Sequence, residues 1–157
     1  MTIFRAAACA ALLGGCAAVG DTGPHDAAMH RAAAADTREA VRFPAALRTH
    51  TLANMRDHLA TLQGIQDAMG HGDYERASAL AEQRLGLSSL EAHGAHEVAR
   101  YMPAGMQEAG TQMHRAASRF AIEATNAGAT GDAKPALEAL ARVTAQCVAC
   151  HAAYRFE

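Results

Sequence analysis

Two cysteines three positions apart, followed at once by a histidine, stand close to the end of the chain as Cys147-Val148-Ala149-Cys150-His151. On a helix, positions i, i+3 and i+4 lie on one face. Both sulfurs can therefore add to the vinyl groups of one porphyrin while the imidazole reaches its iron. This spacing is the attachment signature of a c-type haem. The sequence thus predicts one covalent haem c, with Cys147 and Cys150 as thioether anchors and His151 as the proximal iron ligand.

Two other uses of a Cys-x-x-Cys pair fit the sequence less well. A structural zinc takes four ligands, usually from two such pairs, and the remaining cysteines are Cys9 and Cys16, both near the start. A thioredoxin-like dithiol belongs to a βαβ unit, and no stretch near Cys147 has the pattern of a strand. The sequence also contains no nucleophile constellation and no phosphate-binding loop, so we do not expect an enzyme.

The first residues indicate export. Arg5 precedes an apolar run over residues 6–13 that is too short to span a bilayer. The run closes as Leu12-Leu13-Gly14-Gly15-Cys16, which resembles the lipobox of bacterial lipoprotein signal peptides. The resemblance implies a signal peptide over residues 1–15, a lipid anchor on Cys16 and a membrane-tethered protein in the periplasm. The alternative is an ordinary secretory signal, and either one leads to the compartment where haem c is attached.

Composition and charge narrow the class of the mature chain. Residues 16–43 are small and polar, without an apolar stripe, which predicts a flexible tether. Residues 44–157 are long enough for one domain. Alanine supplies more than a quarter of the sequence and aromatic residues only 4%, a composition that favours helix. The net charge of −2, without a long basic run, argues against a nucleic-acid partner.

Four amphipathic stretches predict four helices. The first follows Phe43-Pro44 and ends at Gly70-His71-Gly72, and Asp73 caps the second. The third follows Met102-Pro103 and is closed by Asn126-Ala127-Gly128 and Gly131, and the fourth begins near residues 132–135. On the first helix, the side chains expected to face inward are Leu52, Met55, Leu59, Leu62, Ile65 and Met69. On the third helix they are Met106, Gly110, Met113, Ala117, Phe120 and Ala124. On the fourth helix they are Leu137, Leu140, Val143, Cys147, His151 and Tyr154.

This pattern predicts an all-α fold, an up-down-up-down four-helix bundle with the haem near the C-terminus. No stretch alternates with a period of two, so we do not expect a sheet. In such a bundle the haem motif lies level with the beginnings of the first and third helices. Four methionines stand at that level: Met55, Met102, Met106 and Met113. Spacing alone leaves open which of them, or which histidine, is the sixth iron ligand, or whether that position is open.

Four helical stretches with Cys-x-x-Cys-His near the end, followed by Ala152-Ala153-Tyr154-Arg155, resemble the cytochrome c′ family of class II c-type cytochromes. The resemblance covers residues 45–155. In that family the first helix supplies the residue on the distal side of the haem, and a methionine there accompanies six-coordinate iron and electron transfer. Met55 stands in that place. The resemblance therefore implies a one-electron carrier with Met55 as distal ligand, redox partner proteins and, as in many members, a homodimer.

The partners of the haem propionates are less clear from the sequence. The family usually has an arginine one turn before the distal residue, where this chain has Thr51. Arg48 and Arg56 are the nearby substitutes. Arg155, one turn past His151, is either a propionate partner or an exposed arginine near the end of the last helix.

Two alternative functions follow from the same residues. A bulky apolar distal side, or an open sixth position, is typical of relatives that bind NO or CO at five-coordinate iron. A non-haem lipoprotein that handles copper is the other alternative, because soft thioether and imidazole donors suit that metal. The residues of this His/Met zone are His93, His96, Met102, Met106, Met113 and His114.

Overall fold

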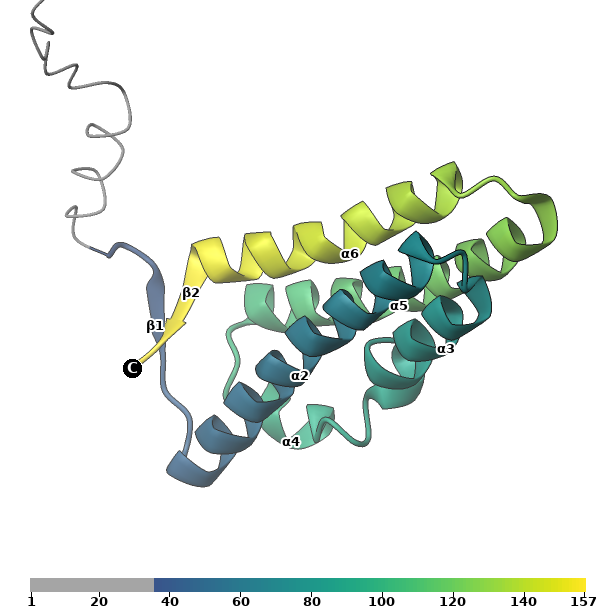
Figure 1. Cartoon of the computed structure of the whole chain (residues 1–157). Helices are drawn as coiled ribbons and strands as arrows, with labels where there is room; N and C mark the ends of the chain where they lie inside the picture. The colour runs from purple at the N-terminus through teal and green to yellow at the C-terminus, as the bar shows by residue number, and fades with distance from the viewer. Residues whose placement is uncertain (1–35) are drawn as a thin grey trace, which may run out of the picture. The chain divides into compact units, whose positions relative to one another are not determined.

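Helices account for most of the residues that the computed structural model describes, which are residues 36–157. The expected signal peptide, the lipidation site Cys16 and most of the expected tether lie outside these residues. In chain order the elements are β1 (Glu39–Val41), α2 (Ala45–Gly70), α3 (Tyr74–Arg84), the 3-10 turn η1 (Leu87–Ser89), α4 (Ala95–Ala99), α5 (Ala104–Thr130), α6 (Lys134–Ala153) and β2 (Tyr154–Phe156) (Figure 1). Within the described residues, none of the helices has both the length and the apolar character that a membrane span requires.

The helices begin and end where local chemistry dictates. Gly72 takes a φ of +73° directly after α2, a left-handed conformation that glycine adopts without strain. The side chain of Asp73 then accepts a hydrogen bond from the backbone N–H of Arg76 at 3.1 Å, which caps α3 as predicted. Pro103 precedes α5, again as predicted. Of the residues expected to close α5, residues 126–128 are still helical, whereas Gly131 ends the helix after Thr130 with a φ of +77°.

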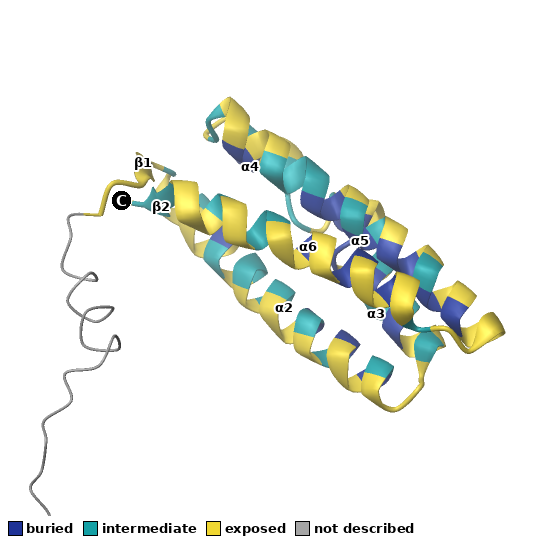
Figure 2. Cartoon of the chain, turned by 90° about the horizontal axis from the view of Figure 1, so that it is seen from above, coloured by how far each residue is buried: buried dark blue, intermediate teal, exposed yellow. Residues whose placement is uncertain are grey.

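The core lies where α3, α5 and α6 meet with the C-terminal half of α2. α5 packs extensively on α6, and both contribute small side chains that let the helices approach closely. Phe120 of α5 is the largest side chain that is fully buried. The other core residues include Ile65, Ala77, Ala81, Leu85, Ala117, Ala124, Ala136, Ala139, Leu140 and Val143. Figure 2 shows the resulting pattern of buried and exposed faces along the helices.

The burial of side chains agrees with the inward-facing stripe predicted for α5 and corrects parts of the stripes predicted for α2 and α6. On this stripe of α5, Met106, Met113, Ala117, Phe120 and Ala124 are buried, and Gly110 is partly buried. Leu59 of α2 and Leu137 of α6 were expected inside but are 70% and 53% exposed. His151 is exposed as well. Two of the three errors, Leu59 and His151, occur at one place, because both residues line the same cavity.

A two-stranded parallel sheet joins the two ends of the described residues, contrary to the expectation of no sheet. β1 pairs with β2 in the register Glu39–Tyr154, Ala40–Arg155 and Val41–Phe156 (Figure 1). Phe43 stacks on Phe156 with ring centroids 5.0 Å apart, and Arg42 forms an ion pair with Glu157. Three-residue strands are too short for alternation to be visible in a sequence. The pairing fixes residues 39–41, at the end of the expected tether, next to the end of α6.

We expect Phe120→Ala to lower the free energy of unfolding by about 3–5 kcal/mol, because it leaves a cavity in an alanine-rich core that has few large side chains to fill it. Ile122→Ala, on the same helix but 61% exposed, is the matched control and should change it by well under half as much. Urea denaturation followed by circular dichroism measures both. Equal losses in the two variants would contradict the position of the core.

Candidate functional site

A cavity of about 390 Å³ lies between α2, α4, α5 and α6, and we call it the main cavity. Its wall is predominantly apolar, and its lining includes the exposed residues Leu59 and His151. Its size is typical of a site for a small organic group or cofactor. The wall also holds most of the sulfur and imidazole groups named from the sequence: Met55, His58, His93, Met102, Met106, Met113, His114, Cys147, Cys150 and His151.

The three residues of the haem signature all line the main cavity. Cys147 and Cys150 are half-buried in the last two turns of α6, and both thiols are free. Burial raises the pKa of each thiol, and for Cys150 the neighbouring Cys147 raises it further. Reactive dithiols instead have a lowered pKa, often at a helix N-terminus. This environment therefore does not favour a redox dithiol.

The predicted methionines gather at the same cavity from three places in the chain. Met55 comes from the middle of α2 and is half-buried. Met102 comes from the turn before α5, and Met106 and Met113 are buried on α5 itself. The structure thus brings together all four candidates for the sixth ligand. Only Met55 and Met106 also line the neighbouring pocket that contains His151.

Three histidines form a cluster that the sequence did not predict. The ring centroids of His58 and His93 are 4.7 Å apart, those of His93 and His114 are 5.4 Å apart, and those of His58 and His114 are 6.2 Å apart. We call these residues the histidine cluster. His93 and His96 were candidates of the same His/Met zone, but His93 is half-buried in the cavity wall, whereas His96 is exposed and lines no part of the cavity. The three residues are far apart in the chain, so only tertiary packing reveals the cluster.

Hydrogen bonds fix two of the three rings. Nδ1 of His114 lies 2.7 Å from the carbonyl oxygen of Leu85, so this nitrogen must donate and Nε2 keeps its lone pair. Nδ1 of His93 lies 3.3 Å from the hydroxyl of Ser89. Nε2 of His58 is different, since it is buried and has no hydrogen-bond partner among residues 36–157. Burial, followed by the nearby His93 and His114, lowers the pKa of His58 to about 4, and burial also lowers the pKa of His93 and of His114.

The loop before α4 is held against α2 by the carbonyl group of His93. The side-chain amide of Asn54 donates to this oxygen at 3.0 Å, and Nε2 of His50 lies at the same distance from it. Gly94 follows with a φ of +60° and begins α4. A β-carbon on Gly94 would lie 3.3 Å from Nε2 of His50. Glycine at this position therefore helps to set His93 in the cavity wall.

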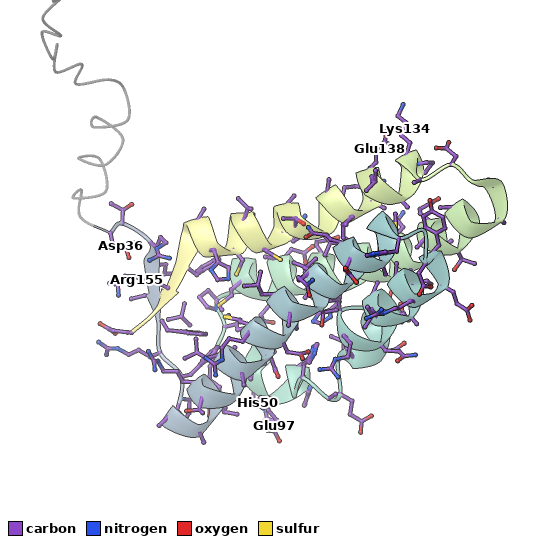
Figure 3. The ribbon with its side chains drawn as sticks, viewed as in Figure 1. Asp36, His50, Glu97, Lys134, Glu138 and Arg155 are labelled. Atoms are coloured by element: carbon purple, nitrogen blue, oxygen red, sulfur yellow. The ribbon has the colours of Figure 1, made fainter. Side chains whose placement is uncertain are left out.

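Three arginines surround a second cavity of about 290 Å³, which adjoins the main cavity through Met55, Met106, Cys150 and His151. We call it the arginine pocket. It is lined by Arg48 of α2, Arg155 of β2 and Arg38, which precedes β1. Nη1 of Arg38 donates to the backbone oxygen of His151 at 3.2 Å. Arg48 and Arg155 were candidates from the sequence, Arg56 lines neither cavity, and Arg38 was missed because only the β1–β2 pairing brings it here. Figure 3 places Arg155 at the opposite end of α6 from Lys134 and Glu138.

Comparison with known proteins adds no assignment: no protein-family model, no curated protein and no solved structure matches this chain. Among residues 36–157, no group of three or more His, Cys, Asp or Glu side chains is arranged to hold a metal ion. The interpretation of the site therefore rests on the residues that line the two cavities.

We expect acid to destabilise the fold through the histidine cluster. Because the pKa of His58 falls from its ordinary 6.5 to about 4, the unfolded chain binds a proton in this range that the folded chain does not. The free energy of unfolding should fall as the pH is lowered from about 6.5 to 4, by on the order of 3 kcal/mol from His58 alone. Urea denaturation at a series of pH values measures this slope. His58→Leu should flatten it, and an unchanged slope in that variant would contradict the buried, neutral state of His58.

Gly94→Ala should lower the free energy of unfolding by about 1–2 kcal/mol, because a left-handed conformation is strained for any residue with a β-carbon. Gly70→Ala is the matched control, since Gly70 is helical and its β-carbon would meet nothing within 4 Å. The control should leave stability unchanged or raise it by about 0.5–1 kcal/mol. Thermal and urea denaturation of both variants provide the comparison.

Proposed function

We propose that this protein is a one-electron carrier that holds a single covalent haem c in the main cavity. The observation that supports this most strongly is that Cys147, Cys150 and His151, which have the spacing of a haem attachment signature, all line one predominantly apolar cavity. Two anchoring thiols and an imidazole donor therefore face the same space. A bound haem c would supply an iron that cycles between the ferric and ferrous states.

Other features of the cavity fit this group. A porphyrin is a large apolar plate with two carboxylates, and the site combines an apolar wall with three adjoining arginines. Haem iron needs only one or two protein ligands, so the site does not depend on a cluster of several metal-binding side chains.

Each residue then has a defined role. Cys147 and Cys150 anchor the group by thioether bonds, and His151 is the proximal ligand. Met55 and Met106 both line the two cavities that contain His151. Of the two, Met55 would be the distal ligand, because it lies on α2, the counterpart of the helix that supplies the distal residue in the cytochrome c′ family. Arg38, Arg48 and Arg155 hold the propionates. The thioether of Met55, in place of a second imidazole, would raise the reduction potential of the bound group, and the apolar wall would limit the water around it.

We extend the proposal to the fold and to the location of the protein. Short connections join α2 to α3 and α5 to α6, while residues 85–103, which include η1 and α4, join α3 to α5. The two short connections support an up-down-up-down bundle like that of the cytochrome c′ family. Residues 1–15 act as a signal peptide, and lipidated Cys16 anchors the mature protein to a membrane in the periplasm. Its partners are redox proteins, and the haem domain forms a homodimer.

A second candidate function is the binding of a soft metal such as Cu(I) without haem. The observation that favours it is that Met55, Met102, Met106 and Met113 line one cavity with His93 and His114. Thioether and imidazole donors suit copper in this state. His96, which the sequence grouped with these residues, is exposed and does not contribute.

Expression with a signal sequence and an intact haem c maturation system tests the first candidate. We expect a red protein whose haem stays bound through denaturation and organic extraction. The ferric spectrum should contain the weak far-red band of a thioether–iron bond, and the ferrous protein should not bind CO. His151→Ala should lose this spectrum and weaken the fold, whereas the exposed His96→Ala should preserve both.

The alternatives give different results in the same experiment. Covalent haem with rapid CO binding and no thioether band would indicate the gas-binding function. A colourless protein that binds Cu(I) would support the second candidate. A colourless protein from cells that mature a control cytochrome would reject the haem proposal.

A further inference from the structure

The buried nitrogen of His58 is the starting point. Its Nε2 is shielded from solvent and lacks a hydrogen-bond partner among residues 36–157, although the ring lines the main cavity. Leaving a buried polar atom unsatisfied costs about 1–3 kcal/mol. A buried polar atom without a partner therefore marks a position at which an ion or a ligand can bind. In the cluster, Nδ1 of His93 and Nδ1 of His114 have groups within hydrogen-bonding distance, whereas Nε2 of His58 is buried without a partner among the described residues.

The position of His58 on α2 relates it to Met55. The two residues are three positions apart, so they share one helix face and differ by about 4.5 Å along the axis. Both line the main cavity together with His151 of α6. α2 packs mainly on α3. The face of α2 that contains Met55 and His58 borders the main cavity instead. The face of α2 that lines the cavity therefore presents a thioether and an imidazole at neighbouring levels.

The state of the ring suits coordination. Burial keeps the imidazole neutral at physiological pH, and neutral imidazole is the form that binds metals. Contacts with His93 at 4.7 Å and His114 at 6.2 Å, measured between ring centroids, hold the ring at the cavity wall. Asp57, Arg84 and His50 are the other charged or titratable groups that act on the cluster.

We propose that His58 is a second distal iron donor, which occupies the position opposite His151 when Met55 is removed. This inference rests on the proposed haem site. It means that the iron keeps two protein ligands when it loses the thioether, at a lower reduction potential, because an imidazole does not favour ferrous iron as a thioether does. Coordination by His58 also satisfies the nitrogen that the fold otherwise leaves buried without a partner.

Four holoproteins test this inference: the wild type, Met55→Ala, Met55→Ala/His58→Ala, and the control Met55→Ala/His71→Ala, which removes an exposed histidine at the end of α2. We expect Met55→Ala to lose the thioether band but to stay low-spin by electron paramagnetic resonance, without CO binding in the ferrous state. Adding His58→Ala should give high-spin iron that binds CO. Adding His71→Ala should give the same spectra as Met55→Ala alone.

The outcomes separate this inference from the proposal it rests on. Wild-type protein without covalent haem rejects the proposed function and the inference together. Covalent haem with high-spin iron in Met55→Ala rejects the inference alone. Low-spin iron that persists in Met55→Ala/His58→Ala also rejects it, because another residue would then be the donor. If the double variant does not fold, as judged by circular dichroism, the spin state of Met55→Ala decides.

Discussion

The packing of α5 on α6 determines the rest of the structure. Ala117 and Ala124 on α5 and Ala136 and Ala139 on α6 are fully buried, and such small side chains let two helices approach closely. This core ends near Val143, while α6 continues for ten more residues to Ala153. The last turns of α6 therefore extend beyond the core, and they contain Cys147, Cys150 and His151. The part of the domain around the α5–α6 core is thus closely packed, whereas the part around the last turns of α6 encloses a cavity.

The main cavity affects the stability of the fold. Side chains that line a void lose the contacts that a packed interior would give them, and Leu59 is 70% exposed beside this void. Burial of apolar area is worth about 25 cal/mol per Å². A flat apolar group bound between α2 and α6 would therefore add its binding free energy to the stability of the fold. A chain with few aromatic residues would gain from such a group the packing that its own side chains do not supply.

Much of the helical pattern could be predicted from the sequence, because glycine, proline and the Asp73 cap act locally. The signature residues could also be predicted, since their spacing along one helix is enough to place them together. Arg38 and the histidine cluster could not, because they meet only through tertiary packing. Leu137 was predicted to be buried from periodicity, which identifies an apolar position but not whether a neighbour covers it. The β1–β2 pairing was missed because three residues are too few to show alternation.

The order of residues along α2 makes the two ends of the site chemically different. Arg48, Met55 and His58 follow one another on this helix, and Arg48 and His58 are ten residues or about 15 Å apart. Arg48 lines the arginine pocket, His58 lines only the main cavity, and Met55 lines both. The charged groups therefore lie on one side of Met55 and the neutral, buried imidazoles on the other. A plate with carboxylates on one edge has one favourable orientation in such a site, because the reverse orientation would bury its charges among the histidines without counter-ions. If the proposed haem is attached to the thiols of Cys147 and Cys150, this asymmetry would set the orientation in which the porphyrin is bound.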